Sequence, residues 1–251
     1  MLTTTILALA GFGAGALNAI AGGGTFLTFP ALVWVGVPPI MANATATFAA
    51  LPGYAGSSWA YRRDIQAGDG PSLRALVFAA MLGGTLGALL LLITPEDLFS
   101  GVVPWLLLIA TLAFAAGPAL LRGLLASGRR LPDAVSLALL LLVSIYGGYF
   151  NGGLGIMLLA ALGLIGMSDL HSMNGLKTLV SLVLSAVSVV TYSLAGLIDW
   201  SALIVTGLGC TAGGYFGAHL ARRVQDPSLL RAFIVTIGLV TSIVFFAQAY
   251  S

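Results

Sequence analysis

The chain has 251 residues, of which 59% are hydrophobic and 7% are charged, and its mean hydropathy is +1.06. Soluble domains carry about 25% charged residues, so this composition excludes a soluble globular domain and indicates an all-α, polytopic membrane protein. The net charge of +2 is too small to indicate a nucleic-acid partner.

Ten apolar segments follow one another along the chain. They cover residues 3–21, 25–37, 40–60, 72–93, 102–121, 134–150, 154–167, 169–198, 201–221 and 229–248. A helix needs about 20 residues to cross a bilayer, so the second and seventh segments are too short. Each of these follows or begins in a glycine cluster, Gly22 to Gly24 in one half and Gly152 to Gly155 in the other. Short, glycine-interrupted segments at matching places in two halves are typical of transporters built from repeats.

Further matches between the halves support a duplication. Residues 83–88 recur as 213–218, Gly36 aligns with Gly166 at the same offset of 130, and Asn18 aligns with Asn151 and Gly22 with Gly155 if three residues are missing from the second copy. We therefore predict two repeats, residues 1–125 and 134–251, joined by a linker at 126–133.

The charges of the short loops predict how each repeat is oriented, because Lys and Arg collect on the cytoplasmic side. The loops at 61–74, 122–133 and 222–231 contain arginines, whereas the loops that hold Glu96 and Asp199 contain no basic residue. Corresponding loops thus carry opposite charge, which predicts inverted repeats and both termini outside the cytoplasm. Five crossings in each half satisfy this pattern, as do three crossings and a re-entrant hairpin made from the first two segments.

Lys177 stands inside an apolar stretch between Leu176 and Leu179. A charge at bilayer depth costs at least ~2.5–3.5 kcal/mol, so such a residue is a functional candidate, and its complement is an anion. Two alternatives are that the side chain extends to a lipid headgroup or pairs with a carboxylate.

The glycine clusters precede short helices, whose free N–H groups and partial positive charge favour anions. Tight interhelical turns would also explain these glycines. Asn and Thr near them can donate hydrogen bonds to an anion or join helices together. The candidate binding residues are Lys177, Asn18, Gly22, Gly23, Gly24, Thr25, Thr45, Thr47, Asn151, Gly152, Gly153, Gly155, Asn174 and Thr178.

Other chemistries have little support. Asp169 lies where a helix is expected to begin, and His171 in the same turn is either a capping or interface residue or a proton relay. Two histidines and Cys210 have no metal-ligand spacing, and no serine has a histidine partner in a nearby motif. We therefore expect no enzyme activity, no metal and no cofactor.

Two stretches resemble the sulfite exporter TauE/SafE family of membrane transporters. Residues 11–47 contain the Gly-rich turn at 20–24, a Phe-Pro-Ala-Leu run at 29–32 and an Ala-Thr motif, and residues 146–178 resemble the second repeat of that family. One departure is that many relatives have Asn-Lys after the first Ala-Thr, where this chain has Ala46 and Thr47, so Lys177 is left without a first-half counterpart.

The resemblance implies export of sulfite, organosulfonates or related organic anions across a bacterial inner membrane. We expect alternating access between the two repeats, with a small anion and the lipid bilayer as partners and a homodimer left open. A passive anion channel, an uptake permease for a small carboxylate or sulfonate, and a structural subunit are the alternatives.

Overall fold

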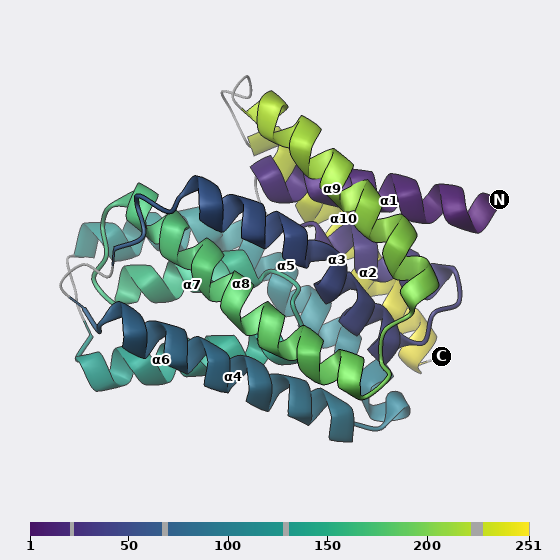
Figure 1. Cartoon of the computed structure of the whole chain (residues 1–251), viewed down its shortest axis with the longest axis horizontal. Coiled ribbons are helices and arrows are strands. Elements are labelled where there is room, and N and C mark those ends of the chain that lie inside the picture. Colours follow the sequence, from purple (N-terminus) through teal and green to yellow (C-terminus); the bar gives the residue numbers. More distant parts are fainter. Residues whose placement is uncertain (21–22, 67–69, 128–130, 222–227, 251) are drawn as a thin grey trace.

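The computed structural model describes residues 1–20, 23–66, 70–127, 131–221 and 228–250. Within these ranges the chain forms ten α-helices and no strands (Figure 1). The helices are α1 (Leu2–Ile20), α2 (Thr25–Trp34), α3 (Pro39–Ala60), α4 (Leu73–Ile93), α5 (Glu96–Ser127), α6 (Asp133–Tyr149), α7 (Leu154–Leu164), α8 (Leu170–Leu194), α9 (Trp200–Ala221) and α10 (Ser228–Tyr250). The prediction of an all-α membrane protein is confirmed.

Each predicted apolar segment corresponds to one helix of the structure. The largest difference is α5, which is longer than the predicted segment 102–121. It begins with Glu96 and Asp97 in its first turn, where negative charge suits the helix dipole although it interrupts an apolar run. Among the described residues, four helices are long and apolar enough to cross a membrane: α4, α5, α8 and α10.

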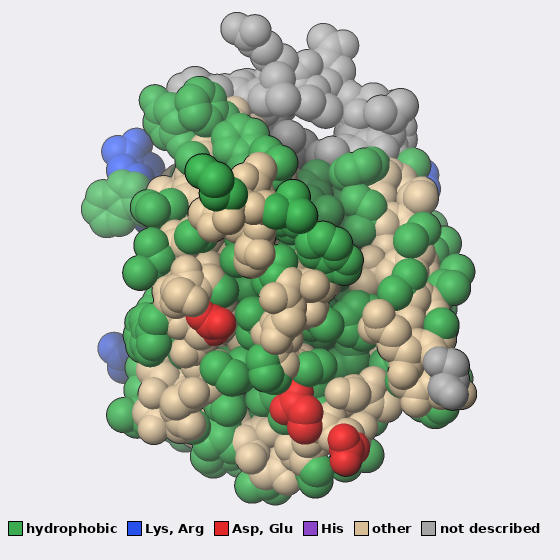
Figure 2. Space-filling view, turned by 90° about the vertical axis from the view of Figure 1, so that its right-hand side faces the viewer, with side chains coloured by type: hydrophobic (Ala, Val, Ile, Leu, Met, Phe, Trp, Pro, Cys, Tyr) green, Lys and Arg blue, Asp and Glu red, His purple; other side chains and the backbone are tan. Residues whose placement is uncertain are grey.

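The outside of the molecule suits lipid rather than water. Large hydrophobic side chains are exposed on several helices, among them Leu208 at 69% and Ile243 at 67%. Figure 2 shows one face that is mostly hydrophobic, with a few acidic side chains in its lower half. An apolar surface this extensive needs an apolar environment.

Glycines bring two pairs of helices into backbone contact. Helix α1 packs along α9, and α4 packs along α6. A Cβ atom added at Gly213 would collide with the backbone of Phe12, and one added at Gly87 would collide with the backbone of Ile145. Small residues at helix contacts are how membrane helices approach closely without a hydrophobic driving force.

The seventh segment does not cross the molecule but turns back along the sixth. The Leu131 N–H donates to the Leu164 carbonyl at 3.1 Å, so α7 ends beside the start of α6. With 11 residues, α7 is about 16 Å long, roughly half of a ~30 Å hydrocarbon core. Helices α6 and α7 therefore form a hairpin whose tip, at 150–153, lies inside the protein.

The first two helices are arranged in the same way. The 10-residue α2 packs on α1, and the Asn18 side chain accepts a hydrogen bond from the Gly24 N–H at 2.7 Å. Gly23 before α2 and Gly153 before α7 both have positive φ, 87° and 71°, a conformation that glycine adopts without strain. Each short helix thus packs back on the helix before it, as expected for the hairpin arrangement.

Helices α3 and α8 run in opposite directions through the centre of the molecule. Near the start of α3, Ile40 N–H donates to Glu96 Oε1 at 3.2 Å, and the Asp199 N–H donates to Thr45 Oγ1 at 3.1 Å. At the other end, the chain after α3 at Asp64 lies against Gly175 near the start of α8. The described acidic loops thus meet at one end of the molecule, and the loop that follows α3, with its arginines, lies at the other. Residues 222–227 of the third basic loop lie outside the described part.

Candidate functional site

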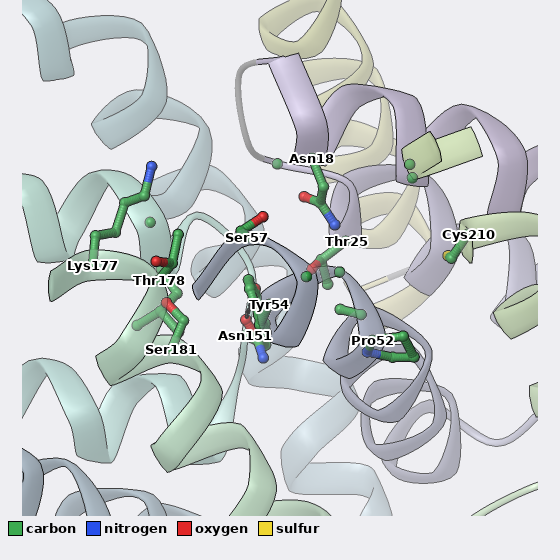
Figure 3. A pocket seen from close by; sticks show the side chains of 18 of the residues that line it. Asn18, Thr25, Pro52, Tyr54, Ser57, Asn151, Lys177, Thr178, Ser181 and Cys210 are labelled. Atoms are coloured by element: carbon green, nitrogen blue, oxygen red, sulfur yellow. Dashed lines mark hydrogen bonds between the residues drawn. The ribbon is translucent and has the colours of Figure 1, made fainter. Parts of the chain in front are cut away.

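A cavity of about 510 Å³ lies between the two hairpin tips and the central helices. The central helices contribute the end of α3 from Ala49 to its cap Tyr61, and α8 between Lys177 and Ser181. The hairpins contribute the end of α1 with Gly23 and Thr25, and Asn151 with residues 153–159. The rest of the wall is α9 between Cys210 and Tyr215, and Phe114 of α5. This volume is within the range of small-molecule sites. Figure 3 shows Lys177 and Cys210 on opposite sides, with Asn18 and Thr25 between them.

Lys177 contributes a positive charge to this wall. It is partly buried, and its Nζ donates to the Asn174 side chain one turn earlier in α8, at 2.8 Å. The described residues that line the cavity include no Asp or Glu. The stem of the side chain passes Gly155, where an added Cβ would lie 3.6 Å from Lys177 Cδ. Lys177 therefore lies beside the N-terminus of α7, on a cavity wall whose described residues include no carboxylate.

The tip of the second hairpin is held by side chains from three helices. The Tyr54 hydroxyl of α3 donates to Asn151 Oδ1 at 3.0 Å, and Asn151 Nδ2 donates to Ser185 Oγ of α8 at 3.1 Å. The Tyr146 hydroxyl of α6 donates to the Gly152 carbonyl at 2.7 Å. These bonds fix the N-terminus of α7 relative to Lys177.

The first tip is held differently. Asn18 caps its own hairpin through the Gly24 N–H, and the positions that match Tyr54 and Ser185 at an offset of 130 are Leu184 and Ala55. Neither of these side chains can form a hydrogen bond, so the pattern around Asn151 has no equivalent around Asn18.

Eight of the predicted residues line the cavity: Asn18, Gly23, Thr25, Asn151, Gly153, Gly155, Lys177 and Thr178. They come from distant parts of the sequence, and the predicted repeat pairs Asn18 with Asn151. Gly22 lies outside the described residues. Gly24 and Gly152 belong to the hairpin tips, where their backbone groups are hydrogen-bonded as given above.

The other predicted residues do not line the cavity, because their side chains are used elsewhere. Thr45 is buried and accepts from Asp199, and the Thr47 hydroxyl donates to the Asn43 carbonyl one turn earlier. Asn174 donates to the Leu170 carbonyl while it accepts from Lys177.

His171 lies in the exposed first turn of α8. There the Asp169 side chain caps the helix by accepting from the N–H groups of His171 and Ser172, at 3.4 and 2.9 Å. The hydrogen bonds from Ser172 hold the pKa of the Asp169 carboxyl below its usual value. His171 itself does not line the cavity, and the residue that caps the helix is Asp169.

The structure also adds residues that the sequence interpretation did not select. Tyr54, Ser57 and Ser181 line the cavity, and Figure 3 shows them between Lys177 and Asn18. Pro52 and Gly53 in the middle of α3 could have indicated this part of the cavity wall, because a proline inside a helix removes a backbone hydrogen bond and bends the helix.

An all-helical membrane protein with a cavity at two helix-hairpin tips, lined by a lysine and several hydroxyl groups, has the features of a membrane transporter. The family described as sulfite exporter TauE/SafE matches residues 7–245, and the chain belongs to this family. It is 27% identical over 238 residues to a protein of Sinorhizobium sp named "probable membrane transporter protein ORF9", covering 94% of this chain and 90% of that one. It is 30% identical over 238 residues to a probable membrane transporter protein of Haemophilus influenzae, covering 93% and 90%. No solved structure matches the chain.

Proposed function

We propose that this protein binds a small anion in the cavity and carries it out of the cytoplasm, with sulfite, organosulfonates and related organic anions as the substrate class. The observation that carries the proposal is Lys177, a cation beside a helix N-terminus in a cavity whose described lining contains no acidic residue. Such a site attracts anions and repels cations.

We infer that the carrier is made of two inverted repeats. In two such repeats the helices α1 to α5 correspond to α6 to α10 in the same order. The packing supports this, because the contact of α1 with α9 then corresponds to the contact of α6 with α4. The pairs α3 with α8 and α5 with α10 each join corresponding helices. The glycine backbone conformations repeat as well. Gly36 and Gly166 have φ of 94° and 97°, and Gly23 and Gly153 pair at the same offset of 130. The antiparallel course of α3 and α8 is what inversion requires.

The position of the cavity supports a state that is open to the cytoplasm. Its wall uses the second half of α3, where Gly53, Gly56 and Ala60 are exposed, whereas residues 42–47 in the first half are buried. The second half of α3 leads to the arginine-containing loop at 61–66. If that loop is cytoplasmic, the cavity receives its anion from inside the cell, as an exporter does.

The buried first half of α3 also favours a carrier over a passive channel. Around it Phe29, Phe99 and Phe150 are fully buried in one hydrophobic cluster, which separates the cavity from the end of the molecule with the acidic loops. A carrier that is closed on one side must change conformation to release its substrate.

Transport in proteoliposomes tests the proposal. We expect counterflow: vesicles loaded with unlabelled ethanesulfonate should accumulate labelled ethanesulfonate transiently, which an open channel does not produce. Protein-free vesicles are the control. Saturable exchange of at least one sulfonate or sulfite supports a carrier, whereas conductance that never saturates would identify a channel, and no flux of any of these anions would refute the proposal.

Thiol labelling tests the direction in which the cavity opens. Cys210 is the single cysteine of the chain, so Cys210→Ser removes the background and Ser57→Cys then places one thiol on the cavity wall. We expect a membrane-impermeant, anionic thiol reagent to label this variant in inside-out vesicles at least tenfold faster than in intact cells. Exchangeable anion should slow the reaction. Equal labelling from the outside would contradict the inward-open assignment.

A further inference from the structure

Three features of the cavity bear on the kind of anion it accepts: its charge, the groups it presents and its size. Lys177 is the charged side chain among the described residues that line the cavity, and these residues include no Asp or Glu. One positive charge compensates one negative charge, and a second buried charge without a partner costs several kcal/mol. At the matching position in the first half stands Thr47, whose hydroxyl is bonded within α3, away from the cavity.

The asparagine at the first hairpin tip, Asn18, presents a donor to a ligand, whereas the Asn151 amide already donates to Ser185 Oγ. A backbone N–H can only donate, so the bond from Gly24 fixes the Asn18 side chain with its oxygen toward that tip and its NH₂ group free to face elsewhere. The oxygen of Asn151 is likewise occupied by the Tyr54 hydroxyl. With both amide oxygens engaged and no carboxylate in the described lining, an ammonium group on the ligand would find no strong acceptor.

The cavity is also much larger than a bare oxyanion. At about 30 Å³ for each water molecule in the liquid, 510 Å³ corresponds to roughly 17 waters, whereas sulfite has four heavy atoms. The wall includes apolar side chains, among them Phe114, and on the side opposite Lys177 it reaches Cys210 (Figure 3). This part of the cavity suits an uncharged organic group.

We propose that within this substrate class the cavity prefers a monoanion with an uncharged organic body, and that it binds dianions, zwitterions and bare oxyanions such as sulfite more weakly. The headgroup lies between Lys177 and the N-terminus of α7, and the organic part extends toward α9. This inference rests on the proposed function, since it names the substrate class of the same site.

A matched series of sulfonates tests the inference, because its members share a headgroup and a two-carbon body. Ethanesulfonate and isethionate end in a neutral group, taurine ends in an ammonium, and sulfoacetate ends in a carboxylate. Binding to the purified wild-type protein in detergent is measured by titration calorimetry, and exchange is measured in proteoliposomes. We expect the two neutral-tailed ligands to bind at least tenfold more tightly than taurine, sulfoacetate, sulfite or sulfate.

Chain length gives a second, independent readout. Each CH₂ moved from water to an apolar wall is worth about a fourfold gain in affinity, so propane- and butanesulfonate should bind progressively better than ethanesulfonate. If taurine or sulfoacetate binds as well as isethionate, or if affinity does not rise with length, the selectivity inference is overturned while anion transport still stands. If none of these anions binds or exchanges, the proposed function itself fails.

Discussion

Lys177→Met is expected to abolish high-affinity anion binding while the protein remains folded. Methionine keeps an unbranched, flexible stem that can still pass Gly155, but it removes the positive charge that the cavity lining offers to an anion. A hydrogen bond to a charged group is worth about 1.5–3 kcal/mol, so affinity should fall by one to two decades. Titration calorimetry with ethanesulfonate and counterflow in proteoliposomes measure the loss.

Arg122→Met is the matched control, because it removes the same charge from an exposed site on α5, where the guanidinium donates to the Pro118 carbonyl of its own helix. It should bind and exchange anion normally. Lys177→Arg should lose much of the binding as well, since a planar fork replaces a compact ammonium in a confined place. If Lys177→Met binds like the wild type, Lys177 serves the membrane interface and the anion site lies elsewhere.

Much of the fold is predictable from the sequence, because hydropathy and loop charge are local properties. Each of the ten segments could be located, although α5 extends beyond the predicted 102–121 at both ends, and the two short segments, 25–37 and 154–167, form the second arms of the hairpins. The choice between a crossing and a hairpin was open, however, because it depends on where α7 ends relative to α6, and that contact joins Leu131 to Leu164.

The candidate site was predictable where the repeat supplied a second observation. Asn18 and Asn151 were selected as a pair beside glycines, and both line the cavity. Thr45 and Thr47 were selected as polar residues within an apolar segment and lie elsewhere, because periodicity alone cannot tell the cavity face of α3 from its packing face.

Tyr54 was not selected for a related reason. An aromatic residue in a membrane segment is first taken as apolar, and nothing close in the sequence indicates that its hydroxyl meets Asn151, 97 positions away. The hydrogen bonds that order a binding site between helices are long-range, so the hydropathy of either helix alone does not contain them.

The glycines at the second hairpin tip separate anion binding from folding, since neighbouring positions meet different surroundings. Gly153 has a φ of 71°, and a Cβ there would lie 3.0 Å from Ala110 Cβ. Gly153→Ala should therefore destabilise the protein by about 1–2 kcal/mol, the cost of a left-handed conformation in a residue with a side chain, and it should lower the thermal midpoint in detergent.

Gly155→Ala is expected to do the opposite, keeping the fold and losing the anion. Gly155 lies in α7 without a positive φ, and its added Cβ meets nothing closer than Lys177 Cδ at 3.6 Å, which is ordinary contact. Alanine is moreover the better helix former by about 1 kcal/mol, so the thermal midpoint should hold or rise.

The methyl group of Gly155→Ala would stand between the Lys177 stem and the start of α7, where a bound anion approaches the backbone most closely. Affinity for ethanesulfonate should fall about tenfold by calorimetry. Unchanged affinity in a folded Gly155→Ala protein would mean that no anion approaches this helix end and that glycine is there for packing.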